Sequence, residues 1–152
     1  MRVTHWGEYG IHCAVFLAKK HDEGRGAVGA TEIAEAQGID TQYAQQVLQR
    51  LRKGSIIESI RGPKGGYRLA RAAEDINIRE VLIAAEGHTF EIICDNKPLD
   101  ERRCDDHSPC YLRGFWYDLR EQVDEFLSAH TLSSLAKQST SSQDLIQISS
   151  PQ

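Results

Sequence analysis

The stretch "ATEIAEAQGIDTQYAQQVLQRLRK", Ala30 to Lys53, contains two helical patterns separated by a short turn. Ile33 and Ala34 form the apolar side of the first pattern, over residues 30–37. Gly38 opens the turn, because glycine readily adopts the left-handed conformation that ends a helix. The second pattern, over residues 41–53, places four residues on one buried face at helical spacing: Tyr43, Val47, Leu48 and Leu51.

A predicted β-hairpin follows directly. The stretch "SIIESIRGPKGGYRLAR", Ser55 to Arg71, has two β-rich segments around a Gly-Pro-Lys-Gly-Gly turn. A short helix, a glycine turn, a second helix and a hairpin, in this order, predict a winged helix-turn-helix. Further helices are predicted over residues 4–20, 77–87 and 108–136. The fold class is therefore mainly α with a small β-hairpin wing.

The chain of 152 residues suits one compact domain with an appended helix. We predict a winged helix-turn-helix DNA-binding domain over residues 1–87 and a cysteine-containing loop over 88–108. A long C-terminal helix over 109–137 and a disordered Ser/Gln-rich tail over 138–152 complete the chain. The long helix carries an apolar stripe at helical spacing: Leu112, Phe115, Trp116, Leu119, Val123, Phe126 and Leu127.

Basic residues gather in one segment although the net charge of the chain is −4. Residues 50–71 hold seven Lys or Arg and one Glu, so this segment carries +6 and the remainder −10. A local basic patch can meet phosphate on an acidic chain, because salt screens charges beyond about 8–10 Å. Arg61, Pro63 and Lys64 lie at the predicted tip of the wing.

The second helix is chemically suited to reading double-stranded DNA in the major groove. Glutamine pairs bidentately with adenine, and Arg or Lys contacts phosphate. The alternative is a solvated amphipathic helix followed by an ordinary hairpin turn. The order of the elements, together with the +6 segment, favours DNA binding by these residues of the helix: Thr41, Gln42, Tyr43, Gln45, Gln46, Gln49, Arg50, Arg52 and Lys53.

Three of the four cysteines lie in "CDNKPLDERRCDDHSPC", Cys94 to Cys110, which has eight charged residues. The chain has no secretion signal and no apolar run long enough to cross a membrane, so we expect a soluble cytoplasmic protein without a membrane partner. Cytosolic thiols stay reduced, so such a group indicates metal or redox chemistry. Zinc bound by three cysteines and His107 is one alternative. Cys13 lies on the apolar stripe of the first helix and is interpreted as a core residue.

The stretches "GIDTQYAQQVLQRLRK" and "IRGPKGGYRLAR" resemble the IscR/NsrR/RsrR (Rrf-type) family of bacterial winged-helix regulators. The resemblance covers about residues 1–135. It implies a homodimer that binds a pseudo-palindromic operator, with an iron–sulfur cluster near a long dimerisation helix. The wing arginine and proline of the family fall on Arg61 and Pro63, and its recognition-helix tyrosine falls on Tyr43.

The resemblance also implies candidate cluster ligands. The spacing Cys104-x5-Cys110 fits the last two ligands of the family, whereas nine residues separate Cys94 from Cys104, more than the usual five. IscR-like members have a histidine where this chain has Arg113, which cannot ligate. RsrR-like members are similar in carrying a Glu-x-x-x-His pattern on the first helix, which implies Glu8 and His12 as ligands together with two cysteines. NsrR-like members take an acidic ligand at the place of Glu8 from the opposite subunit.

The ligand set stays open at this point. His107 and Asp106 are further candidates in the loop. Two cysteines with Glu8 and His12 suit a [2Fe-2S] cluster, which we favour, whereas three cysteines with Glu8 suit [4Fe-4S]. The sequence thus predicts a homodimeric transcriptional regulator controlled by an iron–sulfur cluster that senses redox state, nitric oxide or iron–sulfur status.

Other classes of protein remain as alternatives. One is a DNA-binding regulator without a cluster, dependent on thiols or zinc. Another is an iron–sulfur electron carrier, which leaves the glutamine-rich helix and the basic wing unused. An enzyme is not expected, because the sequence shows no nucleophile–base arrangement and no phosphate-cradling glycine loop.

Overall fold

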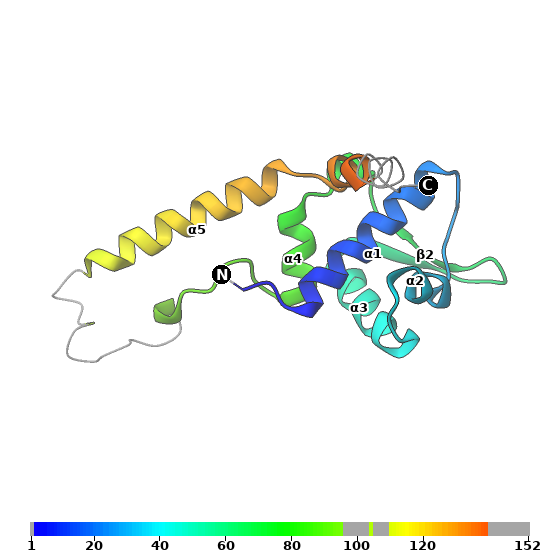
Figure 1. Ribbon diagram of the computed structural model, residues 1–152, viewed down its shortest axis with the longest axis horizontal. Helices are drawn as coiled ribbons and strands as arrows, with labels where there is room; N and C mark the ends of the chain where they lie inside the picture. Colours follow the sequence, from blue (N-terminus) through cyan, green and yellow to red (C-terminus); the bar gives the residue numbers. More distant parts are fainter. Residues whose placement is uncertain (1, 96–103, 105–109, 140–152) are drawn as a thin grey trace, which may run out of the picture.

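The computed structural model describes residues 2–95, 104 and 110–139 (Figure 1). The described chain is mainly helical with one two-stranded antiparallel hairpin, as predicted. Residues 132–139 form a further helical segment. The elements are α1 (His5–Asp22), α2 (Ala30–Gln37), α3 (Thr41–Lys53), β1 (Ile57–Ile60), β2 (Gly66–Leu69), η1 (Ala73–Asp75), α4 (Ile78–Glu86), η2 (Ile93–Asp95) and α5 (Tyr111–Ala129).

Local capping signals set the boundaries of the first three helices. The Thr4 hydroxyl accepts from the Trp6 N–H at 3.2 Å and starts α1. Gly38 ends α2 with φ +64°, in the left-handed region that the glycine turn predicted. Asp40 then caps α3, since its carboxylate accepts from the Tyr43 N–H at 3.0 Å. The helix-turn-helix of the sequence prediction is therefore present.

The wing is joined to the helix-turn-helix by backbone hydrogen bonds. The hairpin pairs Ile57 with Leu69 and Ile60 with Gly66. Val28, just before α2, exchanges two hydrogen bonds with Tyr67, with N–O distances of 2.8 and 2.9 Å. A Cβ on Gly66 would lie 2.3 Å from the Val28 carbonyl oxygen, so only glycine permits this close approach. The hairpin thus gains a third, single-residue strand.

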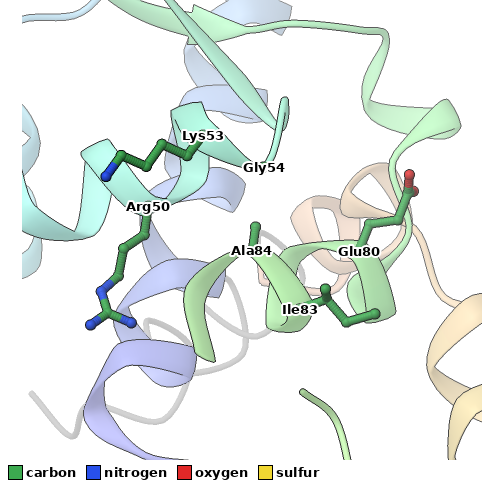
Figure 2. A pocket seen from close by; sticks show the side chains of 6 residues that line it. All are labelled: Arg50, Lys53, Gly54, Glu80, Ile83 and Ala84. Atoms are coloured by element: carbon green, nitrogen blue, oxygen red, sulfur yellow. The ribbon is translucent and has the colours of Figure 1, made fainter. Parts of the chain in front are cut away.

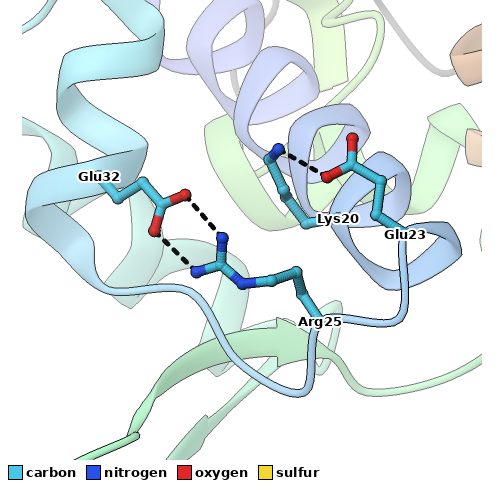
Figure 3. Close-up of polar contacts among 4 residues, drawn as sticks. All are labelled: Lys20, Glu23, Arg25 and Glu32. Atoms are coloured by element: carbon cyan, nitrogen blue, oxygen red, sulfur yellow. Dashed lines mark hydrogen bonds and ion pairs between the residues drawn. The ribbon is translucent and has the colours of Figure 1, made fainter.

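Two ion pairs lie in the segment that leads from α1 to α2 (Figure 3). Lys20 reaches Glu23 at 2.7 Å at the end of α1. The Arg25 guanidinium donates to both carboxylate oxygens of Glu32 at 3.0 and 2.9 Å. This bidentate pair joins the loop to the first turn of α2, close to the Val28 bridge.

The hydrophobic core lies between α1, α3, α4 and the hairpin. Its largest fully buried side chains come from every one of these elements and from the segment after α5. They include Leu17, Leu48, Leu51, Ile57, Val81 and Leu132. The described winged-helix elements therefore enclose a continuous core within one chain.

The predicted long helix is interrupted. It was expected to continue to residue 137, but α5 ends at Ala129 and His130 adopts an extended conformation. Thr131 pairs with Asn77, and the helical segment 132–139 turns back so that Leu132 is fully buried in the core. The helical periodicity continues through the break, so the periodic pattern did not reveal it. Residues 138 and 139, predicted to be disordered, belong to this helix, and the tail from 140 lies outside the described residues.

Helix α5 projects beyond the winged-helix elements (Figure 1). None of its residues is buried. Arg79 of α4 contacts Asp124 at 3.3 Å, and Thr89 also hydrogen-bonds to Asp124. The described helices include none that is long and apolar enough to cross a membrane.

Candidate nucleic-acid interface and cysteine segment

Helix α3 separates its residues into a buried and an exposed face. Ala44, Val47, Leu48 and Leu51 are completely buried. Thr41 is half-buried, and the predicted reading side chains Gln42, Gln45, Gln46 and Gln49 are all exposed. A row of exposed amides on a core-anchored helix can present donors and acceptors to base edges.

Tyr43 occupies a different position from the glutamines. Its ring is half-buried and lies 5.0 Å from the Trp6 ring and 5.8 Å from the Tyr9 ring, between centroids. Burial and the nearby Tyr9 raise the pKa of Tyr43 above its ordinary value of 10.0. The structure therefore places Tyr43 in the α1–α3 contact, at the edge of the face that the glutamines form.

The seven basic residues of the +6 segment fall into two groups. Three are engaged within the chain: Arg68 pairs with Glu58 at 2.5 Å, Arg71 pairs with Glu80 at 2.9 Å, and Arg50 donates to the Ala85 carbonyl at 2.8 Å. All seven residues are exposed, but four of them form no ion pair or hydrogen bond within the described part of the chain: Arg52, Lys53, Arg61 and Lys64. These four side chains are available for an external anion.

Arg50, predicted as a phosphate contact, also contacts two other helices of the same chain. Figure 2 shows its guanidinium directed from α3 toward α1, whereas Lys53 extends away from this contact. The two side chains border a shallow pocket of about 410 Å³ with Glu80, Ile83 and Ala84. The hydrogen-bond partner of Arg50 lies 35 positions away in the sequence, so no local pattern could have revealed this contact.

The tip of the wing is shaped by its glycines. Arg61, Gly62, Pro63 and Lys64 are all exposed. Gly62 has φ +110°, and a Cβ on Gly65 would lie 2.3 Å from the Ile60 carbonyl oxygen. The tight turn thus needs these glycines and presents Arg61 and Lys64 on an accessible loop.

Cys13 is separate from the other three cysteines. It is completely buried in α1, and burial raises the pKa of its thiol to about 12. The interpretation of Cys13 as a core residue is confirmed. Cys94 and Cys104 are half-buried and Cys110 is exposed, and all three thiols are free.

Polar contacts hold η2, and with it Cys94, against α5. The Asp95 carboxylate accepts from the Tyr117 hydroxyl at 2.9 Å and from Arg120 at 2.6 Å. The Tyr117 hydrogen bond, with Arg120, lowers the pKa of Asp95 below its ordinary 3.8 although burial opposes this. Cys110 is the N-cap residue of α5 and makes no capping bond through its side chain.

Glu8 and His12 lie on one side of α1, as the i and i+4 spacing predicted. His12 Nε2 is 3.2 Å from Glu8 Oε1, and the side chains are 56 and 62% exposed, respectively. No three His, Cys, Asp or Glu side chains among the described residues lie close enough together to hold a metal ion. His107 and Asp106 lie outside the described residues.

The donor chemistry of these residues fits a metal centre. Three free thiols, one carboxylate and one imidazole are donors that iron–sulfur clusters and zinc accept. Each of the five side chains is at least partly exposed, so no core packing prevents their use. Glu8 and His12 belong to α1, whereas Cys94 lies in η2 and Cys110 is the N-cap of α5, so the donors come from different elements of the chain.

Sequence reasoning missed two residues beside the candidate site. Trp6 lies under the Arg50 guanidinium, 4.0 Å from its carbon to the ring centroid. Glu86 accepts from the Thr4 and Gly7 backbone N–H groups at 2.7 and 3.0 Å. The contacts of Glu86 span 79 and 82 positions, so no local pattern could have revealed them.

A glutamine-faced second helix, a basic wing and a shared core define a winged helix-turn-helix protein of the DNA-binding class. Comparison with known proteins narrows this class. The sequence model of the Rrf2 family, described as an iron-dependent transcriptional regulator, matches residues 3–138. The chain belongs to the Rrf2 family of transcriptional regulators.

Relatives in several bacteria are similar over most of their length. A putative HTH-type transcriptional regulator of Neisseria meningitidis serogroup A is 33% identical over 91% of this chain and 89% of the relative. The regulator IscR of Xenorhabdus nematophila is 34% identical over 90% of this chain and 80% of IscR. These proteins are named as regulators, consistent with the expectation that this chain is not an enzyme.

Two solved structures share the fold. IscR of T. potens aligns with a TM-score of 0.71 and 27% identity, over 94% of this chain and 91% of IscR. CymR, the global cysteine regulator of B. subtilis, aligns with a TM-score of 0.70 and 27% identity, over 90% of this chain and 97% of CymR. The fold is thus shared by IscR and by a protein named as a cysteine regulator.

Proposed function

We propose that this chain is a homodimeric transcriptional regulator whose affinity for a pseudo-palindromic operator is set by an iron–sulfur cluster. The observation that carries the proposal is that the candidate donors stand on different elements of the chain. Glu8 and His12 lie on α1, whereas the cysteines lie beside α5, and the described donors form no three-residue group within one chain. A dimer through α5 can supply both groups to one centre.

The surface of α5 supports dimerisation. Large apolar side chains stay exposed on it within the single chain, and they lie on the stripe predicted from helical spacing. A second copy of the same stripe would remove them from water, as in a self-complementary two-fold interface. The exposed members are Leu112, Phe115, Trp116, Leu119 and Phe126.

DNA contact is assigned to α3 and the wing. The exposed glutamines of α3 read base edges in the major groove, and the wing tip meets the backbone beside it. The four unengaged cations, Arg52, Lys53, Arg61 and Lys64, contact phosphate, while Pro63 stiffens the tip. In a dimer the two α3 helices would address half-sites about one helical turn apart.

Cys104 and Cys110 of one subunit, with Glu8 and His12 of the other, are the ligand set we favour, and it suits [2Fe-2S] better than [4Fe-4S]. Cys94 is the alternative third thiol. A bound cluster would supply a centre that changes with redox state, nitric oxide or iron supply. Bonds from Glu8 and His12 would join α1 to the dimer helices, and α1 packs directly on α3. A coupling of about 1–3 kcal/mol changes operator affinity about 5–150-fold.

The test replaces both α1 ligands in Glu8→Ala/His12→Ala. Protein purified without oxygen is analysed for visible absorption, iron and acid-labile sulfide, and for operator binding with and without oxidant. We expect an altered spectrum and loss of the redox response, with operator affinity of the cluster-free form retained. The control, His21→Ala/Asp22→Ala, removes an exposed imidazole and an exposed carboxylate from the other end of α1. An unchanged spectrum and response in the double variant would exclude these ligands.

A cluster-free regulator is the second candidate, favoured by the similarity to the cysteine regulator CymR. In this case Cys104 and Cys110 respond as thiols, or the donors hold zinc. Colourless protein with a reversible disulfide, or with zinc in place of iron, would support this candidate. Iron and sulfide in equal amounts would support the cluster.

The wing contact is tested separately with Arg61→Ala. We expect weaker DNA binding. The slope of the logarithm of the association constant against the logarithm of the salt concentration should become shallower by about one, because one phosphate contact is lost. The control is Arg68→Ala at an arginine already paired with Glu58. An unchanged salt slope in Arg61→Ala would remove Arg61 from the interface.

A further inference from the structure

Arg50 holds three helices together. Its Nη1 donates to the Ala85 carbonyl at the end of α4 at 2.8 Å. Its guanidinium carbon lies 4.0 Å from the centroid of the Trp6 ring at the start of α1. Figure 2 shows the side chain crossing from α3 toward α1, with Ala84 of α4 beside it. A stacked arginine that also hydrogen-bonds a carbonyl fixes its own helix in orientation as well as in distance.

Glu86, which follows Ala85 at the end of α4, binds the start of α1. One carboxylate oxygen accepts from the Thr4 N–H at 2.7 Å, the Thr4 hydroxyl at 3.1 Å and the Gly7 N–H at 3.0 Å. Since Ala85 and Glu86 are consecutive, the last turn of α4 binds α3 through a carbonyl and α1 through a carboxylate. The free N–H groups of the first α1 turn favour this negative charge.

The contact between α1 and α4 leaves little room for displacement. A Cβ on Gly7 would lie 2.2 Å from a carboxylate oxygen of Glu86, and one on Gly10 would lie 2.8 Å from the Ala85 Cβ. Trp6 also contacts the α3 residue Tyr43, with the ring centroids 5.0 Å apart. A displacement of α1 must therefore alter the contacts that hold α3.

We propose that Arg50 is a positioning residue for operator recognition, which sets the orientation of α3 through Trp6 and the end of α4, and that it contacts no phosphate. The proposal rests on the function proposed above, in which α3 reads the operator. Arg52 is the matched comparison, because it lies two positions further along the same helix and is exposed like Arg50, but has no ion-pair or hydrogen-bond partner in the described chain.

The two roles leave different signatures in DNA binding. A phosphate contact contributes equally to any sequence and adds about one to the salt slope. A positioning residue aligns side chains with base edges, so its loss reduces affinity for the chosen sequence more than for random DNA. Affinity for both kinds of DNA, measured over a range of salt, therefore separates the roles.

The experiment compares Arg50→Lys, Arg50→Gln and Arg52→Gln in the full chain. The probes are a duplex selected from random DNA by the unaltered protein and a random duplex of equal length, followed by fluorescence anisotropy. We expect both Arg50 variants to lose about tenfold or more on the selected duplex, since a charge-assisted hydrogen bond is removed or weakened, with little change on random DNA and an unchanged salt slope. Arg52→Gln should weaken both duplexes alike and lower the slope by about one.

Equal weakening on both duplexes by Arg50→Gln, with a lower slope, would overturn the proposal, as would a full retention of affinity by Arg50→Lys. Circular dichroism shows whether the variants fold. If they do not, Trp6→Phe gives a second test without any change of charge: a reduced preference for the selected duplex supports the positioning role, and an unchanged preference overturns it. Failure of the unaltered protein to prefer any duplex would instead remove the proposed function.

Discussion

The winged-helix elements and α5 differ in how far their apolar side chains are buried. In the winged helix, α1, α3, α4 and the hairpin cover one another, and residues such as Leu51 and Val47 have no exposed surface. Along α5, Phe115 and Phe126 keep 57 and 65% of their surface exposed. The winged helix buries its apolar side chains within one chain, whereas α5 leaves a row of large apolar side chains exposed, as expected of a surface that another chain covers. The two proposed roles, DNA reading and subunit assembly, thus fall on separate parts of the fold.

The largest expected difference between the regions concerns thiol reactivity. In reduced, cluster-free protein, alkylation of Cys13 should be at least about 1000-fold slower than that of Cys110, because a buried thiol reacts only after the core opens. Alkylation over time, followed by mass spectrometry of the peptides, measures both rates, and denatured protein gives the unprotected reference. Comparable rates for the two thiols would show that the core around α1 is not closed.

Truncation of the core is expected to have the next largest effect. Leu51→Ala should lower the free energy of unfolding by about 2–5 kcal/mol, because a cavity replaces a fully buried side chain. Urea unfolding followed by circular dichroism at two protein concentrations measures the loss. The exposed neighbour in Arg52→Ala should change stability by less than about 0.5 kcal/mol. A small effect of Leu51→Ala would contradict a core completed by one chain.

A charge introduced on the apolar stripe of α5 should disrupt the proposed dimer, in contrast to the loss of stability expected in the core. Leu119→Asp is expected to give a monomer whose operator affinity is at least about 100-fold lower, since the advantage of two linked half-site contacts is lost. Sedimentation gives the mass and anisotropy gives the affinity. Ser128→Asp adds the same charge on the opposite side of α5 and should leave the dimer intact. A dimeric Leu119→Asp protein would place the interface elsewhere.

The smallest expected effect concerns the contact between η2 and α5. Because Tyr117 and Arg120 lower the pKa of Asp95, this contact stabilises the folded chain above about pH 3.8 and is lost as pH falls through the lower folded value. The stability difference between the unaltered protein and Asp95→Asn should therefore be present at neutral pH and vanish in acid. An NMR titration of the Asp95 carboxyl should show its midpoint below 3.8, and a midpoint above 3.8 would contradict the contact.

The parts of the fold that follow local rules could be predicted from the sequence. The glycine turn at Gly38, the Thr4 cap and the hairpin around "GPKGG" each depend on a few adjacent residues. The break at His130 could not be predicted, because it depends on Leu132 entering a core built by distant residues. In the same way, the exposed glutamines followed from helical spacing, whereas the partner of Arg50 is a carbonyl on another helix.

For the candidate ligands, too, the sequence predicted local neighbours but not how residues far apart in the chain lie relative to one another. Spacing identified Glu8 and His12 as neighbours on one helix face, and their side chains lie 3.2 Å apart. No spacing rule states how that pair lies relative to Cys104 and Cys110. Their meeting remains a prediction about two chains.

The backbone pairing of Val28 with Tyr67 has a consequence for how binding preferences can diversify. The wing and the residue just before α2 share one small sheet, so main-chain hydrogen bonds hold the wing beside the start of the helix-turn-helix. If α3 and the wing both contact DNA as proposed, exchange of the exposed glutamines could change the target sequence and leave this pairing intact. The same pairing makes insertions beside Val28 or Gly66 costly, so length variation should accumulate elsewhere in the chain.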